Sequence, residues 1–189
     1  MSAQPRAADV IGDWPEESRE AAQLVVEKYG EPHEATVSQL IWNGVGPWKR
    51  IIAQRAHWEH RFPAPHTDSV ETFIDYRVPS EMLTPLAQFD GSVMVERTTG
   101  EVSARCHDEQ ANMLALNLMD EMVNGTKGVG EARDYYAKEF LVARRKQLTP
   151  YMEKLRFAPL AGSTADPDER VLSKEELDRA VQDGNEAAG

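Results

Sequence analysis

The residues with the clearest chemical potential lie in one short, proline-containing segment. His60, His66 and Asp68 carry imidazole and carboxylate groups, and Pro63 and Pro65 lie between them. These groups are common protein ligands of Zn²⁺ and similar divalent metals, and a His–Asp pair is also a frequent acid–base unit. His66 and Asp68 project to the same side of an extended chain. We therefore predict that the three residues form either a divalent metal site or an acid–base catalytic site.

The segment that carries them, residues 57–68, is expected to be a stiff loop. Prolines one residue apart fix φ and favour an extended course, so the imidazoles would be partly positioned before any ligand binds. The spacing matches no compact metal signature such as His-Glu-x-x-His, and structural or surface histidines are the alternative interpretation. A functional site here needs a further partner from the sheet or the long helix, which we expect among Glu59, Glu109 and Asp120.

A second pattern, Cys106-His107-Asp108, places a thiol beside a base at a strand-to-helix junction. Neighbours in sequence rarely face each other, and catalytic partners normally come from separate segments. Strand alternation puts Cys106 on the inward face with Val102 and Ala104, so we expect a buried structural thiol. As the single cysteine of the chain, it forms no internal disulfide.

Aromatic side chains suggest a second class of function. If they lie together in an exposed patch, the protein is a non-catalytic binding or homo-oligomeric assembly module that presents them to a partner. The residues concerned surround the first predicted hairpin and the segment after it: Trp42, Trp48, Trp58 and Phe62.

The elements that must position these residues predict an α+β fold. Asp13, Pro15 and Glu16 indicate the start of a helix that ends near Tyr29. Alternating β-rich runs predict an antiparallel sheet of about five strands built around two hairpins, at residues 36–42, 49–56, 70–78, 92–97 and 101–106. Helical spacing from residue 108 onward predicts helices that pack on one face of this sheet, ending near residue 157.

Composition divides the chain into three parts. Residues 1–12 are small, polar and aperiodic, and are expected to be flexible. Residues 13–157 form a single α+β domain. Residues 158–189 carry eight acidic against three basic residues and too little apolar surface to offset the entropy of ordering, so we predict a disordered acidic tail.

Charge limits the partners. With 32 acidic and 21 basic residues the net charge is −11, which disfavours binding to the phosphate backbone of nucleic acids. No stretch has the apolar length of a membrane span or the pattern of a signal peptide, so we expect no membrane partner and a cytoplasmic location. Self-association or a small molecule remain as expected partners.

Five further segments have a recognisable sequence: Lys28–Pro32, Gly46–Arg50, His60–Asp68, Asp90–Val93 and Asn112–Leu118. Through these segments, about residues 14–143 resemble a group of uncharacterised bacterial proteins. The resemblance implies a bacterial, single-domain protein, and it implies no activity, cofactor or catalytic residue.

Overall fold

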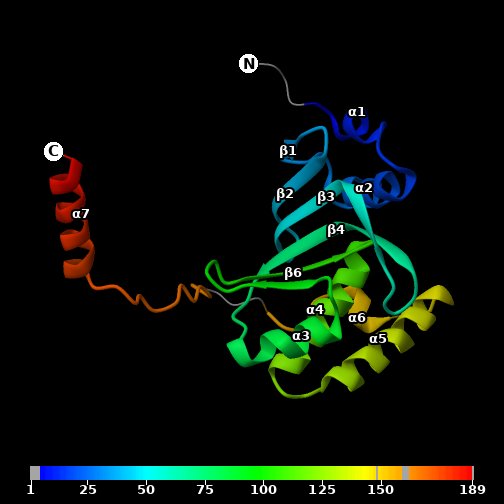
Figure 1. Ribbon diagram of the computed structural model, residues 1–189. Coiled ribbons are helices and arrows are strands. Elements are labelled where there is room, and N and C mark those ends of the chain that lie inside the picture. Colours follow the sequence, from blue (N-terminus) through cyan, green and yellow to red (C-terminus); the bar gives the residue numbers. More distant parts are fainter. Residues whose placement is uncertain (1–4, 148, 159–161, 189) are drawn as a thin grey trace.

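The architecture is α+β. The computed structural model describes residues 5–147, 149–158 and 162–188, which form seven α-helices and one antiparallel sheet of six strands (Figure 1). The predicted class is therefore confirmed, with one strand more than the expected five. The strands are β1 (Glu34–Ala35), β2 (Gln39–Val45), β3 (Trp48–His60), β4 (His66–Asp75), β5 (Val93–Glu96) and β6 (Glu101–Cys106), in the spatial order β1-β2-β3-β4-β6-β5.

The longest hairpin, β3–β4, replaces the predicted loop. Residues 57–60 continue β3 and residues 66–68 begin β4, so only residues 61–65 form the connection. Prolines lack a backbone N–H to donate to a ladder, and Pro63 and Pro65 both fall in this connection, where no ladder bond is lost. The Phe62–Pro63 peptide bond is cis. The prolines thus mark the turn of a hairpin, and the prediction of a loop over 57–68 is wrong.

Helices cover one face of the sheet. α2 contacts β3 and β4, whereas α4 contacts β4, β5 and β6, and α3 and α6 pack around α4 and α5 (Figure 1). No helix among the described residues is both long and apolar enough to cross a membrane. The helices are α1 (Ala7–Ile11), α2 (Glu16–Tyr29), α3 (Leu83–Phe89), α4 (Glu109–Val123), α5 (Val129–Arg144), α6 (Pro150–Glu153) and α7 (Lys174–Ala188), with a 3₁₀ turn at Ser80–Met82.

Local signals explain where the helices beside the site begin and end. The Asp108 side chain accepts a hydrogen bond from the Ala111 N–H at 2.8 Å, and so caps α4 where the sequence predicts it. Gly30 has a φ of 80°, a left-handed value that favours glycine and terminates α2.

Two of the tryptophans expected on a partner surface lie in the core. The exposed fraction of Trp42 is 0% and that of Trp48 is 2%. The indole N–H of Trp48 donates to Glu109 at 2.6 Å, and the same carboxylate accepts from Tyr29 and Lys28. Burying an indole requires a partner for its N–H, and this carboxylate supplies it.

The other two aromatic residues are also engaged within the chain. Trp58 is 43% exposed and lies under the guanidinium of Arg105 at 4.2 Å, whereas half-buried Phe62 packs against Tyr136 with ring centroids 5.0 Å apart. The four aromatic side chains do not form a common exposed patch. The hypothesis of an assembly surface built from them is therefore wrong.

Both terminal segments make more contacts than their composition predicts. From Pro5 onward the expected flexible N-terminus contains α1, whose Ala7 and Ile11 are buried, while residues 1–4 lie outside the described residues.

Part of the predicted tail lies against the β5–β6 turn. The buried Thr164 hydroxyl donates to the carbonyl of Gly100 at 2.7 Å, and Arg97 forms ion pairs with Asp166 and Asp168. Polar contacts hold residues 162–168 against this turn without much apolar burial, and α7 is helical (Figure 1). Disorder of the tail stays a prediction, and residues 159–161 and 189 lie outside the described part.

Candidate functional site

The β3–β4 hairpin brings the three predicted site residues together. His60 lies directly opposite His66 in the antiparallel register, so the two side chains are cross-strand neighbours with ring centroids 4.9 Å apart. Asp68 follows His66 by two positions and shares its face of the strand. One ligand atom from each of the three residues lies within 4.8 Å of the others.

The register that creates this neighbourhood depends on an irregularity in β3. Ala53 lies opposite Val70 and Trp58 lies opposite Asp68, so four residues of β3 face a single residue of β4. Extra residues of this kind bend a strand and change which side chains lie opposite each other. His60 would not face His66 in a regular ladder continued from Ala53.

The carboxylate of Asp68 is the centre of the cluster. Its exposed fraction is 3%. Oδ2 accepts a hydrogen bond from the Ser92 hydroxyl at 2.8 Å and lies 3.3 Å from Nδ1 of His60. Oδ1 lies 3.1 Å from Nε2 of His66, and this buried oxygen has no hydrogen-bond partner among the residues that the structure describes.

The hydrogen bonds around the imidazoles determine their neutral tautomers. Nδ1 of His66 lies 2.8 Å from the carbonyl oxygen of Ala64, which only accepts, so Nδ1 carries the proton. The Ser92 hydroxyl gives its proton to Asp68 and therefore accepts from Nδ1 of His60 at 3.0 Å. Both neutral rings are thus left with an unprotonated Nε2, the form in which imidazole binds a metal or accepts a proton.

A second buried carboxylate makes the site strongly negative. Asp90 lies 3.7 Å from Nε2 of His60 and accepts a hydrogen bond from the backbone N–H of Ser92 at 2.8 Å. Burial raises the pKa of Asp90 above its ordinary value. Burial also opposes ionisation of Asp68, but its two imidazole neighbours and the hydrogen bond from Ser92 outweigh burial and hold its pKa below the ordinary value.

The neighbouring groups respond to this negative charge. Burial disfavours the protonated form of His66, yet the nearby Asp68 carboxylate and the hydrogen bond to the Ala64 carbonyl outweigh it and raise the pKa of His66. Burial, with the charge of Asp68, raises the pKa of the Cys106 thiol well above its ordinary value. The site therefore favours added positive charge.

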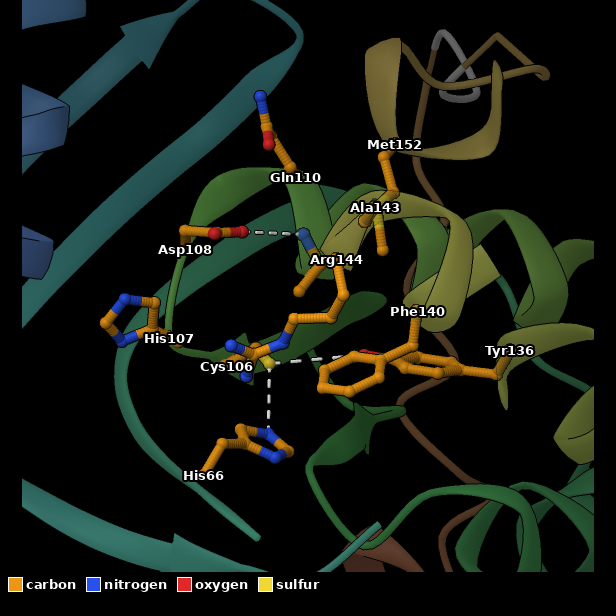
Figure 2. A pocket seen from close by; sticks show the side chains of 11 residues that line it. His66, Cys106, His107, Asp108, Gln110, Tyr136, Phe140, Ala143, Arg144 and Met152 are labelled. Atoms are coloured by element: carbon orange, nitrogen blue, oxygen red, sulfur yellow. Dashed lines mark hydrogen bonds between the residues drawn. The ribbon is translucent and has the colours of Figure 1, made fainter. Parts of the chain in front are cut away.

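Cys106 pairs with a histidine from a distant segment and not with its neighbour His107. Its Sγ lies 3.3 Å from Nε2 of His66 and 4.0 Å from the hydroxyl of Tyr136 (Figure 2). The thiol is buried as strand alternation predicts. Because its pKa is raised, it is a proton donor to His66 and not a ready thiolate nucleophile.

The further partners expected from the sequence are not at the site. Glu59 is exposed and pairs with Arg61, Glu109 holds Trp48, and Asp120 accepts a hydrogen bond from Tyr76. All three expectations are wrong because each carboxylate has closer partners on neighbouring elements.

The further partners of the cluster are Ser92 and Asp90, which lie in the turn between α3 and β5. Sequence reasoning missed them because Asp90-Gly91 reads only as a turn. The local pattern contains no signal that this turn meets the β3–β4 hairpin.

A pocket of about 330 Å³ lies next to the cluster and shares His66 with it, and Cys106, which contacts His66, also lines the pocket (Figure 2). Its remaining lining comes from the start of α4, from α5 and from α6: His107, Asp108, Gln110, Ala111, Tyr136, Phe140, Ala143, Arg144 and Met152. The histidine cluster is therefore reached from a cavity of the size that holds a small molecule.

Comparison of the chain with protein-family models, with curated proteins and with solved structures finds no match.

Proposed function

We propose that the protein binds a divalent transition metal of the zinc class through His60, His66 and Asp68. The observation that carries this proposal is the buried Oδ1 of Asp68, which lies 3.1 Å from Nε2 of His66 and has no hydrogen-bond partner in the described part of the chain. With the His66 proton on Nδ1, two unprotonated acceptor atoms face each other. A cation between them removes this repulsion and gives the buried Oδ1 a partner.

The distances suit a small ion. Zinc is held at about 2.0–2.2 Å by nitrogen and oxygen ligands, which places neighbouring ligand atoms roughly 3–4 Å apart. The separation of 3.1 Å between Oδ1 of Asp68 and Nε2 of His66 falls in this range. The ligand atoms of all three residues lie within 4.8 Å of one another, so the side chains need to shift by about 1 Å to close around the ion.

The surrounding charge and hydrogen bonds favour a bound metal rather than a metal-free His–Asp acid–base pair. Asp68 and Asp90 are two buried carboxylates without a lysine or arginine bonded to either in the described residues. A divalent cation compensates both charges. The Ala64 carbonyl and Ser92 hold the imidazoles through Nδ1, which is the supporting arrangement that metal-binding histidines use.

Two imidazoles and one carboxylate leave a coordination position open, which is the pattern of catalytic and not of structural zinc sites. The pocket beside His66 supplies access for a small-molecule substrate. The proposed function is thus that of a small metal-dependent enzyme, in which the ion polarises a substrate group or activates a water molecule.

Metal binding is tested on the full chain after removal of bound ions with a chelator. Calorimetric titration with Zn²⁺ is expected to show one strong site in the wild type and in His33→Ala, a control that removes an exposed imidazole remote from the site in the sequence. His66→Ala and Asp68→Asn are each expected to weaken binding by more than about 100-fold, because loss of a ligand exceeds the effect of losing a supporting group.

Circular dichroism of each variant checks that it remains folded. A folded Asp68→Asn variant that binds Zn²⁺ as tightly as the wild type would overturn the proposal, and so would a wild type that binds no stoichiometric Zn²⁺.

A further inference from the structure

We propose that the pocket beside the cluster binds a small monocarboxylate with a compact apolar body, and that Arg144 anchors the carboxylate next to the metal. This inference deepens the proposed function and rests on it for the metal. The observations that carry it are the lining of the pocket, the charge of that lining, and the His66 side chain, which the pocket shares with the cluster.

One side of the pocket is apolar. Phe140 and Ala143 from α5, Ala111 from α4 and Met152 from α6 contribute its hydrophobic lining. A volume of about 330 Å³ corresponds to roughly eleven water molecules at about 30 Å³ each. A ligand of about ten non-hydrogen atoms fills such a space, and an aromatic or branched aliphatic body matches these walls.

Among the described residues, Arg144 is the single lysine or arginine in the lining. Its guanidinium stacks on the ring of Phe140 at 4.9 Å, and within the described residues it has no carboxylate partner. From the sequence, cations near the end of this helix indicate no more than compensation of the helix dipole. In the structure the Arg144 side chain runs from α5 across the pocket, towards the side where Cys106 and His66 lie (Figure 2).

The charge balance of the lining selects the kind of anion. Asp108 also lines the pocket, although its carboxylate is engaged in capping α4. Outside the lining, Asp68 lies 3.1 Å from Nε2 of His66, and Asp90 lies 3.7 Å from Nε2 of His60. The single guanidinium lies among these three aspartates and compensates one negative charge of a ligand. It therefore suits a monocarboxylate better than a phosphate dianion, and it binds a carboxylate through two parallel hydrogen bonds.

The position of His66 determines which end of the ligand lies next to the metal. His66 belongs both to the metal cluster and to the pocket, and the thiol of Cys106 contacts it. A carboxylate on Arg144 therefore lies towards the metal, while the apolar body extends towards Phe140 and Met152. Chemistry at the metal would then act on the carboxylate end of the substrate and not on its apolar end.

The probe is phenylacetate, which has ten non-hydrogen atoms, titrated calorimetrically into the zinc-loaded full chain. Phenylacetamide has the same shape without the charge, and inorganic phosphate tests a dianion. Arg144→Gln is expected to weaken phenylacetate binding at least tenfold. Arg145→Gln, which removes an exposed charge at the next position outside the pocket lining, is expected to leave it unchanged.

The outcomes separate this inference from the proposed function because Zn²⁺ binding is measured on the same samples. If Zn²⁺ binds and phenylacetate does not, or binds Arg144→Gln as well as the wild type, the inference is overturned and the metal site stands. Equal binding of phenylacetamide or preferential binding of phosphate also overturns it. If phenylacetate binding depends on Arg144 but Zn²⁺ does not bind, the carboxylate pocket is supported and the proposed function fails.

Discussion

Ser92 offers the sharpest test of the metal site because it contacts two proposed ligands without being one. Its hydroxyl donates to Asp68 at 2.8 Å and accepts from His60 at 3.0 Å. Ser92→Ala removes both bonds and leaves every ligand atom present. Loss of such a supporting group typically costs 10-fold to 100-fold in metal affinity, which corresponds to about 1.4–2.7 kcal/mol.

The same substitution has a predictable cost in the metal-free protein. Oδ2 of Asp68 is buried, and an unsatisfied buried acceptor costs about 1–3 kcal/mol of folding stability. Ser103→Ala is the matched control. Ser103 is buried to a similar extent, and its hydroxyl donates to a carboxylate oxygen of Glu71 at 2.7 Å, on the same sheet but outside the cluster.

Zn²⁺ titration gives the affinities and urea unfolding of the metal-free proteins gives the stabilities. We expect both variants to lose stability, but only Ser92→Ala to lose affinity. Zn²⁺ affinity of Ser92→Ala within twofold of the wild type would refute the reasoning, since Ser92 would then orient no ligand. An equal loss in Ser103→Ala would refute it as well, since a general loosening of the sheet would explain the effect.

Three other predictions concern the structure around the site. Glu109→Gln is expected to lower the free energy of unfolding in urea by about 2–4 kcal/mol, because this carboxylate accepts three hydrogen bonds at the junction of α2, β3 and α4. Zn²⁺ affinity is expected to stay unchanged. A loss of stability of less than about 0.5 kcal/mol would contradict the role of the carboxylate. Gly100→Ala places a Cβ 2.3 Å from the backbone of Thr164, so limited proteolysis is expected to cleave residues 162–168 faster than in the wild type. The control is Gly44→Ala, at a position with a positive φ but open space around it, and it is expected to leave this cleavage unchanged. Equal cleavage in both variants would show that the segment does not depend on the contact between Gly100 and Thr164. Burial opposes ionisation of Glu101, but ion pairs with a lysine and an arginine outweigh it and depress its pKa below the ordinary 4.5; its stabilising contribution is therefore present above that pH and lost as the pH falls further. Glu101→Gln is expected to reduce the fall in urea midpoint below pH 4.5, with an effect of under about 1 kcal/mol for this partly exposed group, and an unchanged pH profile would contradict the assignment.

Much of the fold follows from local patterns. Alternation along β6 correctly turns Cys106 inward, and Asp108 marks the start of α4 because a side chain that caps its own helix needs no distant partner. Alternation likewise predicts that His66 and Asp68 share a side. The segments that local patterns describe poorly are the termini, since α1 and residues 162–168 are held by contacts to the folded domain.

The sequence by itself determined the α+β class, the inward thiol and the pair His66 and Asp68, because backbone geometry sets each of these over a few residues. Only the tertiary structure decided that His60 lies opposite His66, since that register depends on the irregularity in β3. It also decided that Ser92 hydrogen-bonds to Asp68, 24 positions away in the chain. Contacts between distant segments depend on how whole elements pack, and no local periodicity records them.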